Sequence, residues 1–121
     1  MNSTRAIEQL LAIVHADPTD MRARLKLGDV YARTGNHPNA LEMYEEVGRY
    51  YAHEGFMLKA VAVYKQMCEM VARDAPHLRQ RYAHVPPLLA GLFQQLGLNN
   101  DAVAALDALG GDWPRGKYGP S

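Results

Sequence analysis

Residues 27–44 read LGDVYARTGNHPNALEMY, and this stretch decides the fold. It holds a small residue, an aromatic, a glycine, an alanine and a second aromatic at fixed spacings: Gly28, Tyr31, Gly35, Ala40 and Tyr44. Glycine followed by asparagine is typical of the left-handed turn that ends a helix. A proline two residues later fits the first turn of the next helix. The small residues on either side of the turn allow close contact, so the stretch predicts an antiparallel helical hairpin.

The same spacing occurs twice more along the chain. The second copy consists of Gly48, Tyr51, Gly55, Ala60 and Tyr64, and the third consists of Ala90, Phe93, Gly97, Ala102 and Leu106. Recurring helical hairpins are typical of helical repeat arrays, which usually bind other molecules and do not catalyse reactions. The distance is 20 residues from Gly28 to Gly48 but 42 residues from Gly48 to Ala90. The first two copies therefore share a helix, and the array is irregular.

Apolar residues recur at helical spacing over most of the chain, and no segment alternates as a half-buried strand does. We expect helices over six segments, which are residues 4–16, 21–34, 38–54, 57–73, 86–96 and 100–109. Residues 77–84 are also compatible with a short helix. Pro86 and Pro87 leave two alternatives, a break before a new helix or a single kinked helix. We favour the break, because two prolines fit a first turn better than a helix interior.

These segments predict a single all-α domain over residues 1–109, built from five or six antiparallel helices. Residues 110–121 are rich in glycine and proline, and we expect them to form a tail with little order. Terminal repeats need a cover for their apolar face. Trp113 in this tail is therefore expected to cover the last helix, and the alternative is a recognition motif for another protein.

Residues 38–54 carry apolar side chains over more than half of the helix circumference, which is typical of a helix in the centre of a bundle. This helix belongs to both the first and the second copy of the repeat. Gly48 lies in its interior, where glycine costs about 1 kcal/mol relative to alanine. We expect this glycine to permit close backbone approach to Ala60 across the hairpin, and the alternative is that it simply weakens the helix. We also expect a bulky substitution there to damage the fold most.

The composition bears on the class of protein and its partners. The formal net charge is +0, so no overall basic charge favours nucleic acid. Near-zero charge gives little repulsion between copies of the chain, and a homo-oligomer is therefore an open alternative. The sequence shows neither a membrane-spanning stretch nor a signal peptide, and its one cysteine, Cys68, can form no internal disulfide. The cytoplasm is the expected location.

No arrangement of residues suggests an enzyme, a cofactor or a metal site. The five histidines lack the four-residue spacing that places two ligands on one helix face. Cys68 lies on the apolar side of its helix, where a buried, unreactive thiol is expected. A local group of arginines with a tyrosine could contact RNA or DNA, but a polar surface turn is the favoured interpretation. This group is Arg73, Arg79, Arg81 and Tyr82.

The first copy of the spacing resembles the tetratricopeptide repeat, in which leucine-glycine, tyrosine, glycine, alanine and an aromatic occur in this order. The match includes Leu27 before Gly28, and Asp17 with Pro18 at the repeat boundary. The resemblance covers most of residues 17–109. It implies an array or bundle of helical hairpins that binds a peptide or protein segment on its concave face. The chain would then act as a scaffold or adaptor.

The resemblance leaves two further functions open, a self-associating structural module and a secretion-type chaperone. Some members of the family hold the C-terminal carboxylate of a partner with lysine, asparagine and arginine. The corresponding positions of the first copy are Leu25 and Asp29. Leucine does not bind a carboxylate and aspartate repels it, so we expect no partner of that kind.

The resemblance also identifies positions that face the groove. Seven of them carry charged or polar side chains: Arg22, Asp29, Arg33, Glu42, Glu45, Arg49 and His53. One hypothesis is that they form a wall of mixed charge that binds a charged segment of a partner protein. The alternative, which we favour, is a solvated face stabilised by the helical pairs Asp29–Arg33 and Glu45–Arg49.

Overall fold

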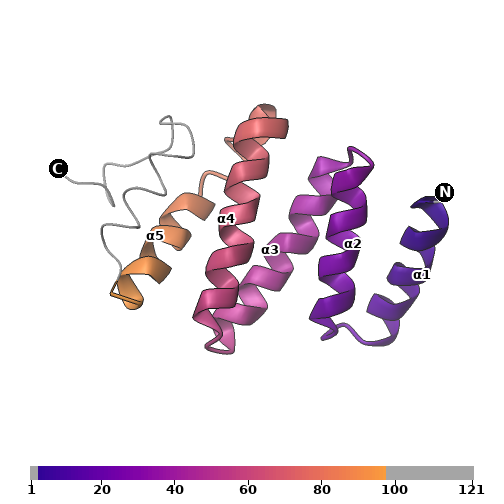
Figure 1. Cartoon of the computed structure of the whole chain (residues 1–121), viewed down its shortest axis with the longest axis horizontal. Coiled ribbons are helices and arrows are strands. Elements are labelled where there is room, and N and C mark those ends of the chain that lie inside the picture. Colours follow the sequence, from indigo (N-terminus) through magenta and orange to yellow (C-terminus); the bar gives the residue numbers. More distant parts are fainter. Residues whose placement is uncertain (1–2, 98–121) are drawn as a thin grey trace.

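The computed structural model describes residues 3–97, which consist of helices joined by turns, without a strand. The elements are α1 (Ser3–Ala16), α2 (Met21–Arg33), α3 (His37–His53), α4 (Met57–Asp74), the short 3-10 helix η1 (Pro76–Leu78) and α5 (Val85–Gln95). The five α-helices follow one another in a row, and successive helices run in opposite directions (Figure 1). Within this part of the chain, no helix is both long enough and apolar enough to cross a membrane.

The predicted all-α class is confirmed, and the five predicted helices in this range agree with the observed ones to within one residue at each end. The chain breaks before the two prolines, as expected. Pro86 and Pro87 lie in the first turn of α5, where a missing backbone N–H leaves no helical hydrogen bond unmade. The predicted helix over 100–109 and the predicted tail lie outside the described residues. So do Ala102, Leu106 and Trp113.

Two helices, α2 and α3, have a polar capping side chain at the N-terminus and a glycine shortly after the C-terminus. The Asp20 carboxylate accepts a hydrogen bond from the N–H of Ala23 at 3.0 Å, and Asn36 caps α3 in the same way. After α2 and α3, Gly35 and Gly55 adopt φ values of +82° and +84°. Glycine takes this left-handed conformation without steric cost. The chain therefore reverses within three residues at both turns.

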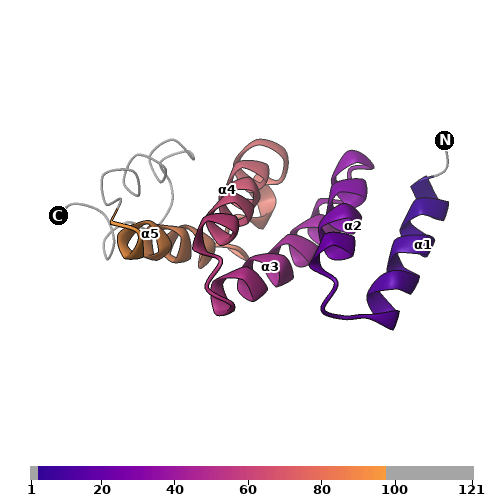
Figure 2. The same ribbon diagram turned by 60° about the horizontal axis from the view of Figure 1, so that its bottom comes forward.

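α3 is central, as its sequence predicts, because it packs against both α2 and α4. Figure 2 shows α3 running between these two helices. Its buried residues are Ala40, Leu41, Tyr44, Val47 and Gly48. The larger apolar cluster extends from α3 through α4 to α5. A smaller cluster joins α1 and α2, with Met43 of α3 packed against it.

The repeated spacing marks positions in this core. Three alanines of the repeated spacing are completely buried. They are Ala40 and Ala60 of the first two copies, and Ala90, which replaces the first glycine in the third copy. The aromatics three residues after each small residue pack against the larger cluster, and they are Tyr31, Tyr51 and Phe93.

The glycines inside α2 and α3 make room for tyrosine rings. A Cβ atom added at Gly28 would lie 2.8 Å from the ring of Tyr44, and one added at Gly48 would lie 2.9 Å from the ring of Tyr64. Such distances are shorter than carbon atoms tolerate. The expected close contact at Gly48 is therefore present, and the atoms nearest to the added Cβ belong to the ring of Tyr64. The reason is that Tyr64, one turn beyond Ala60 on the same face of α4, fills the space with its larger side chain.

Candidate interaction surface

The structure places the seven predicted groove residues in several different contacts. Arg22 lines a hollow between α1 and α2, while Asp29 contacts α3 through Tyr44. Glu42 lies about 160° around α3 from Tyr44, at 100° per residue, and therefore on the far side of that helix. His53 is 87% exposed at the end of α3, where it contacts the neighbouring Glu54. Arg33, Glu45 and Arg49 are described with the contacts of α3 that follow.

Tyr44 links α2 to α3. Its hydroxyl donates a hydrogen bond to Oδ1 of Asp29 at 2.5 Å. Burial raises the pKa of Tyr44 above its ordinary value of 10.0, and the hydrogen bond and charge of Asp29 raise it further. Arg33 and Gln66 act on the same hydroxyl in the opposite direction. Asp29 therefore belongs to a contact between helices, and its carboxylate is already engaged.

Replacing Tyr44 with phenylalanine tests this contact. We expect Tyr44→Phe to lower the free energy of unfolding by about 1.5 kcal/mol, because it removes a hydrogen bond to a charged group and leaves the ring in place. Urea unfolding at neutral pH measures the change. Tyr50→Phe, at a half-buried tyrosine of the same helix, is the control. Equal changes in the two variants would show that the bond to Asp29 contributes nothing.

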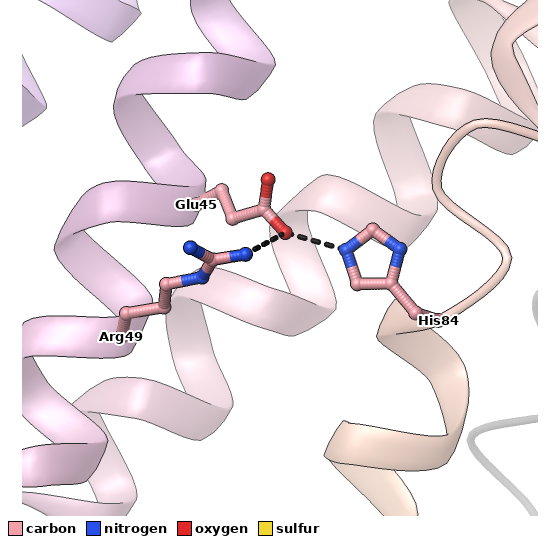
Figure 3. Close-up of polar contacts among 3 residues, drawn as sticks. All are labelled: Glu45, Arg49 and His84. Atoms are coloured by element: carbon pink, nitrogen blue, oxygen red, sulfur yellow. Dashed lines mark hydrogen bonds and ion pairs between the residues drawn. The ribbon is translucent and has the colours of Figure 1, made fainter.

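Glu45 joins α3 to the segment that precedes α5. Its Oε2 accepts a hydrogen bond from Nε2 of His84 at 2.5 Å and one from Nη2 of Arg49 at 3.5 Å. Figure 3 shows the two donors on opposite sides of the carboxylate. The side chain of Glu45 is 17% exposed, while those of Arg49 and His84 are 69% and 48% exposed. The predicted helical pair Glu45–Arg49 is therefore present, within a larger cluster that also holds His84.

An ion pair between Glu42 and Arg81 also joins α3 to the segment that precedes α5. Glu42 lies 3.8 Å from Nη2 of Arg81, and Tyr82 beside it is buried, which raises the pKa of its hydroxyl. Arg73 pairs with the adjacent Asp74 at 3.2 Å. Two arginines of the local basic group thus have carboxylate partners. Such pairs are what a polar surface turn, the favoured interpretation, leads us to expect.

Exposed apolar side chains gather where α4 begins and α5 lies beside it. Four large apolar side chains are exposed in residues 3–97, and three of them are here. Phe56, Leu58 and Leu88 are 50%, 70% and 45% exposed. Two open hollows of about 370 and 420 Å³ adjoin these side chains, and Met57 lines both. We call this region the apolar surface, and define it as Phe56, Met57, Leu58 and Leu88.

Charged groups border the apolar surface. Tyr64 lines the smaller hollow. Burial raises the pKa of its hydroxyl, and the charges of Arg49 and Glu45 act on that hydroxyl in opposite directions. The ammonium group of Lys59 lies 5.2 Å from the centre of the Phe56 ring, within the range of a cation–π contact. An apolar centre with a charged edge is the usual anatomy of a protein-binding surface.

The chain was compared with known proteins in three ways. No family model, curated protein or solved structure matches it. The resemblance to the tetratricopeptide repeat therefore remains a prediction that rests on the residues of the sequence.

Two observations concern metal binding and thiol reactivity in the described residues. In the described part of the chain, no three or more histidine, cysteine, aspartate or glutamate side chains are grouped to hold a metal ion. Cys68 is buried, which raises the pKa of its thiol to about 12. The predicted burial of this thiol is confirmed, and at neutral pH it is protonated and therefore a poor nucleophile.

Sequence reasoning missed the apolar surface, although a signal was present. In the second copy of the spacing, Phe56 and Leu58 stand where the first copy has Asn36 and Pro38. Asn36 caps its helix, whereas α4 has no side-chain cap at Phe56. An exposed aromatic at a position suited to a capping residue breaks a local rule, and such departures are common at functional sites. No comparable feature of the sequence indicated that His84 would contact Glu45.

Proposed function

We propose that this chain is a protein–protein interaction module that binds a segment of another protein on the apolar surface. The observation that carries the proposal is the concentration of Phe56, Leu58 and Leu88 around two adjoining hollows. Scattered exposed apolar residues are ordinary, but a contiguous group with a polar border is typical of a binding site. The resemblance to the tetratricopeptide repeat adds to the proposal, since that family binds protein segments.

The two hollows indicate how such a segment would be held. Bulky apolar side chains of the partner would enter the hollows, where most of the binding energy of an interface is concentrated. The ammonium group of Lys59 at the edge would influence the rate of association more than the affinity. The proposed role is that of a scaffold or adaptor, and the proposed location is the cytoplasm.

Leu88→Asp tests the proposal directly. A carboxylate placed at the edge of the smaller hollow must lose water when a partner binds, so we expect affinity to fall on the order of tenfold or more. Ile13→Asp is the matched control. Ile13 is 44% exposed, against 45% for Leu88, but it lies on α1 at the other end of the row.

The measurement has two stages. Proteins captured by the wild-type chain from extracts of its own cells are identified and produced separately, and calorimetry then gives the dissociation constant for each variant. We expect Leu88→Asp to weaken binding while Ile13→Asp matches the wild type. If both variants bind like the wild type, the apolar surface is not the binding site.

A second copy of this chain is the alternative occupant, and the zero net charge together with the same apolar surface favours it. Sedimentation equilibrium at several concentrations separates the two. A dimer that Leu88→Asp dissociates would assign the surface to self-association. A monomer at all concentrations would remove this alternative.

A further inference from the structure

Lys59 stands in the first turn of α4, where two aromatic rings hold its ammonium group. The ammonium group lies 5.2 Å from the centre of the Phe56 ring and 5.5 Å from the centre of the Tyr51 ring. The two rings pack edge to face, with their centres 6.3 Å apart. Attraction to both rings restricts a long side chain that is otherwise exposed to solvent. The positive charge of Lys59 therefore has a defined place beside the apolar surface.

The larger hollow brings this charge and apolar side chains together. Lys59 lines the hollow of about 420 Å³ with Phe56, Met57 and Leu58. An apolar side chain of a partner that enters this hollow displaces water from the ammonium group as well as from the apolar side chains. Loss of water from a charged group is costly unless another polar or charged group replaces the water. A carboxylate of the partner is the group that compensates an ammonium ion best.

The neighbouring charged residues have contacts of their own. Arg49 and Glu45, whose charges act on the tyrosine of the smaller hollow, form an ion pair. Glu54, the acidic residue nearest to Lys59 in the sequence, contacts His53 and lines neither hollow. The net charge of the chain is +0, so attraction of a charged partner depends on local charge. At the larger hollow, that local charge is the positive charge of Lys59.

We propose that the protein segment that binds the apolar surface carries an acidic side chain next to the apolar side chain that enters the larger hollow. Its carboxylate contacts the ammonium group of Lys59, which has three donors and therefore retains its position over the rings. The proposal rests on the proposed function, because it describes the partner of the same surface. Complementary charge of this kind selects among apolar segments, since a lysine or arginine in place of the acidic residue is repelled.

Selection of random peptides displayed on phage tests the proposal with the full-length chain. The peptides are fused to the phage through their C-termini, so that an acidic preference reports side chains and not a terminal carboxylate. We expect the wild-type chain to enrich peptides with a bulky apolar residue and an aspartate or glutamate within about four positions, which is one helical turn. Lys59→Glu is expected to replace this acidic residue with lysine or arginine, because the charge beside the hollow is reversed.

Lys65→Glu is the matched control. It makes the same change of net charge on an exposed side chain of the same helix, but Lys65 lines neither hollow. We expect this variant to select the same peptides as the wild type. If Lys59→Glu and Lys65→Glu select the same peptides, the charge of Lys59 does not choose the partner and the proposal is wrong.

Leu88→Asp separates failure of this proposal from failure of the proposed function. Apolar peptides that show no acidic preference and that Leu88→Asp no longer binds would overturn the acidic partner and leave the proposed function standing. Peptides that bind Leu88→Asp as well as the wild type would overturn both.

Association kinetics of a selected peptide give an independent check. Lys59→Gln removes the charge, and we expect it to lower the association rate constant on the order of tenfold at low salt while the dissociation rate constant changes little. This difference is expected to shrink between about 0.01 M and about 0.15 M salt, because the charge is then screened. Equal association rate constants for the wild type and Lys59→Gln at low salt would contradict the proposal.

Discussion

Gly48→Val is expected to lower the free energy of unfolding by about 3 kcal/mol, because it forces a side chain into space that a buried ring already fills. The first added atom would lie 2.9 Å from the ring of Tyr64, before the two methyl groups of valine are placed. Tyr64 is only 3% exposed and sits in the larger cluster, so moving its ring aside would disturb buried packing. Overpacking of this kind typically costs about 1–3 kcal/mol and occasionally more. Urea unfolding followed by circular dichroism measures the loss.

Gly91 supplies the matched control for this prediction. It also lies inside a helix, but an added Cβ would have no heavy atom within 4 Å. Gly91→Ala is therefore expected to stabilise the chain by about 0.5–1 kcal/mol through the lower entropy of the unfolded state. We further expect Gly48→Ala to cost less in a chain that also carries Tyr64→Leu. An equal cost in both backgrounds would show that the ring of Tyr64 is not what excludes a side chain at Gly48.

Alkaline pH is expected to destabilise the fold, because buried cysteine and tyrosine side chains ionise more easily in the unfolded chain. Burial raises the pKa of Cys68 from 9.0 to about 12, and it raises the pKa values of Tyr44, Tyr64 and Tyr82 above 10.0. A group whose pKa is raised on folding stabilises the fold fully below its unfolded pKa, and this contribution is lost as pH rises through the folded value. Stability should therefore be constant up to about pH 9 and fall beyond it. For Cys68 alone, the shift corresponds to a loss of up to about 4 kcal/mol.

Urea unfolding at intervals between neutral pH and about pH 11 measures this loss. Cys68→Ala removes the thiol, so we expect its stability to fall less steeply between about pH 9 and pH 10, before the tyrosines titrate. The steeper decline above that range should remain, because the tyrosines are still present. If wild type and Cys68→Ala lose stability in parallel from pH 9 upward, the thiol does not ionise on unfolding as described.

The helices of this chain could be predicted closely because their signals are local. Gly35 and Gly55 each mark a turn, and Pro86 with Pro87 marks the first turn of a helix, so the boundaries needed no knowledge of distant contacts. The central place of α3 followed from its wide apolar arc in the same way. The nearest neighbour of Gly48 could not be predicted in this way, because the sequence alone does not show that the ring of Tyr64 lies over the glycine.

The candidate site could not be predicted in the same way, since it depends on the fold bringing Leu88 of α5 beside Met57 of α4. The polar contacts of α3 depend on distant residues as well. Glu45 and His84 are 39 positions apart, and only the path of the chain between α4 and α5 brings them together. The seven predicted groove residues were assigned by analogy with a regular array. Because α3 contacts α2 on one side and the segment before α5 on another, Asp29 and Glu42 lie on different surfaces.

The measurement that tests the central claim most directly is photo-crosslinking from the apolar surface in the cells that produce this chain. A benzophenone amino acid is placed at Leu88, and in a second variant at Ile13, whose exposure is nearly the same. Our account predicts that position 88 crosslinks to a distinct protein, that this protein binds the purified chain, and that position 13 does not capture it. Crosslinks to that protein from both positions alike, or none from position 88 while position 13 captures a partner, would contradict the account.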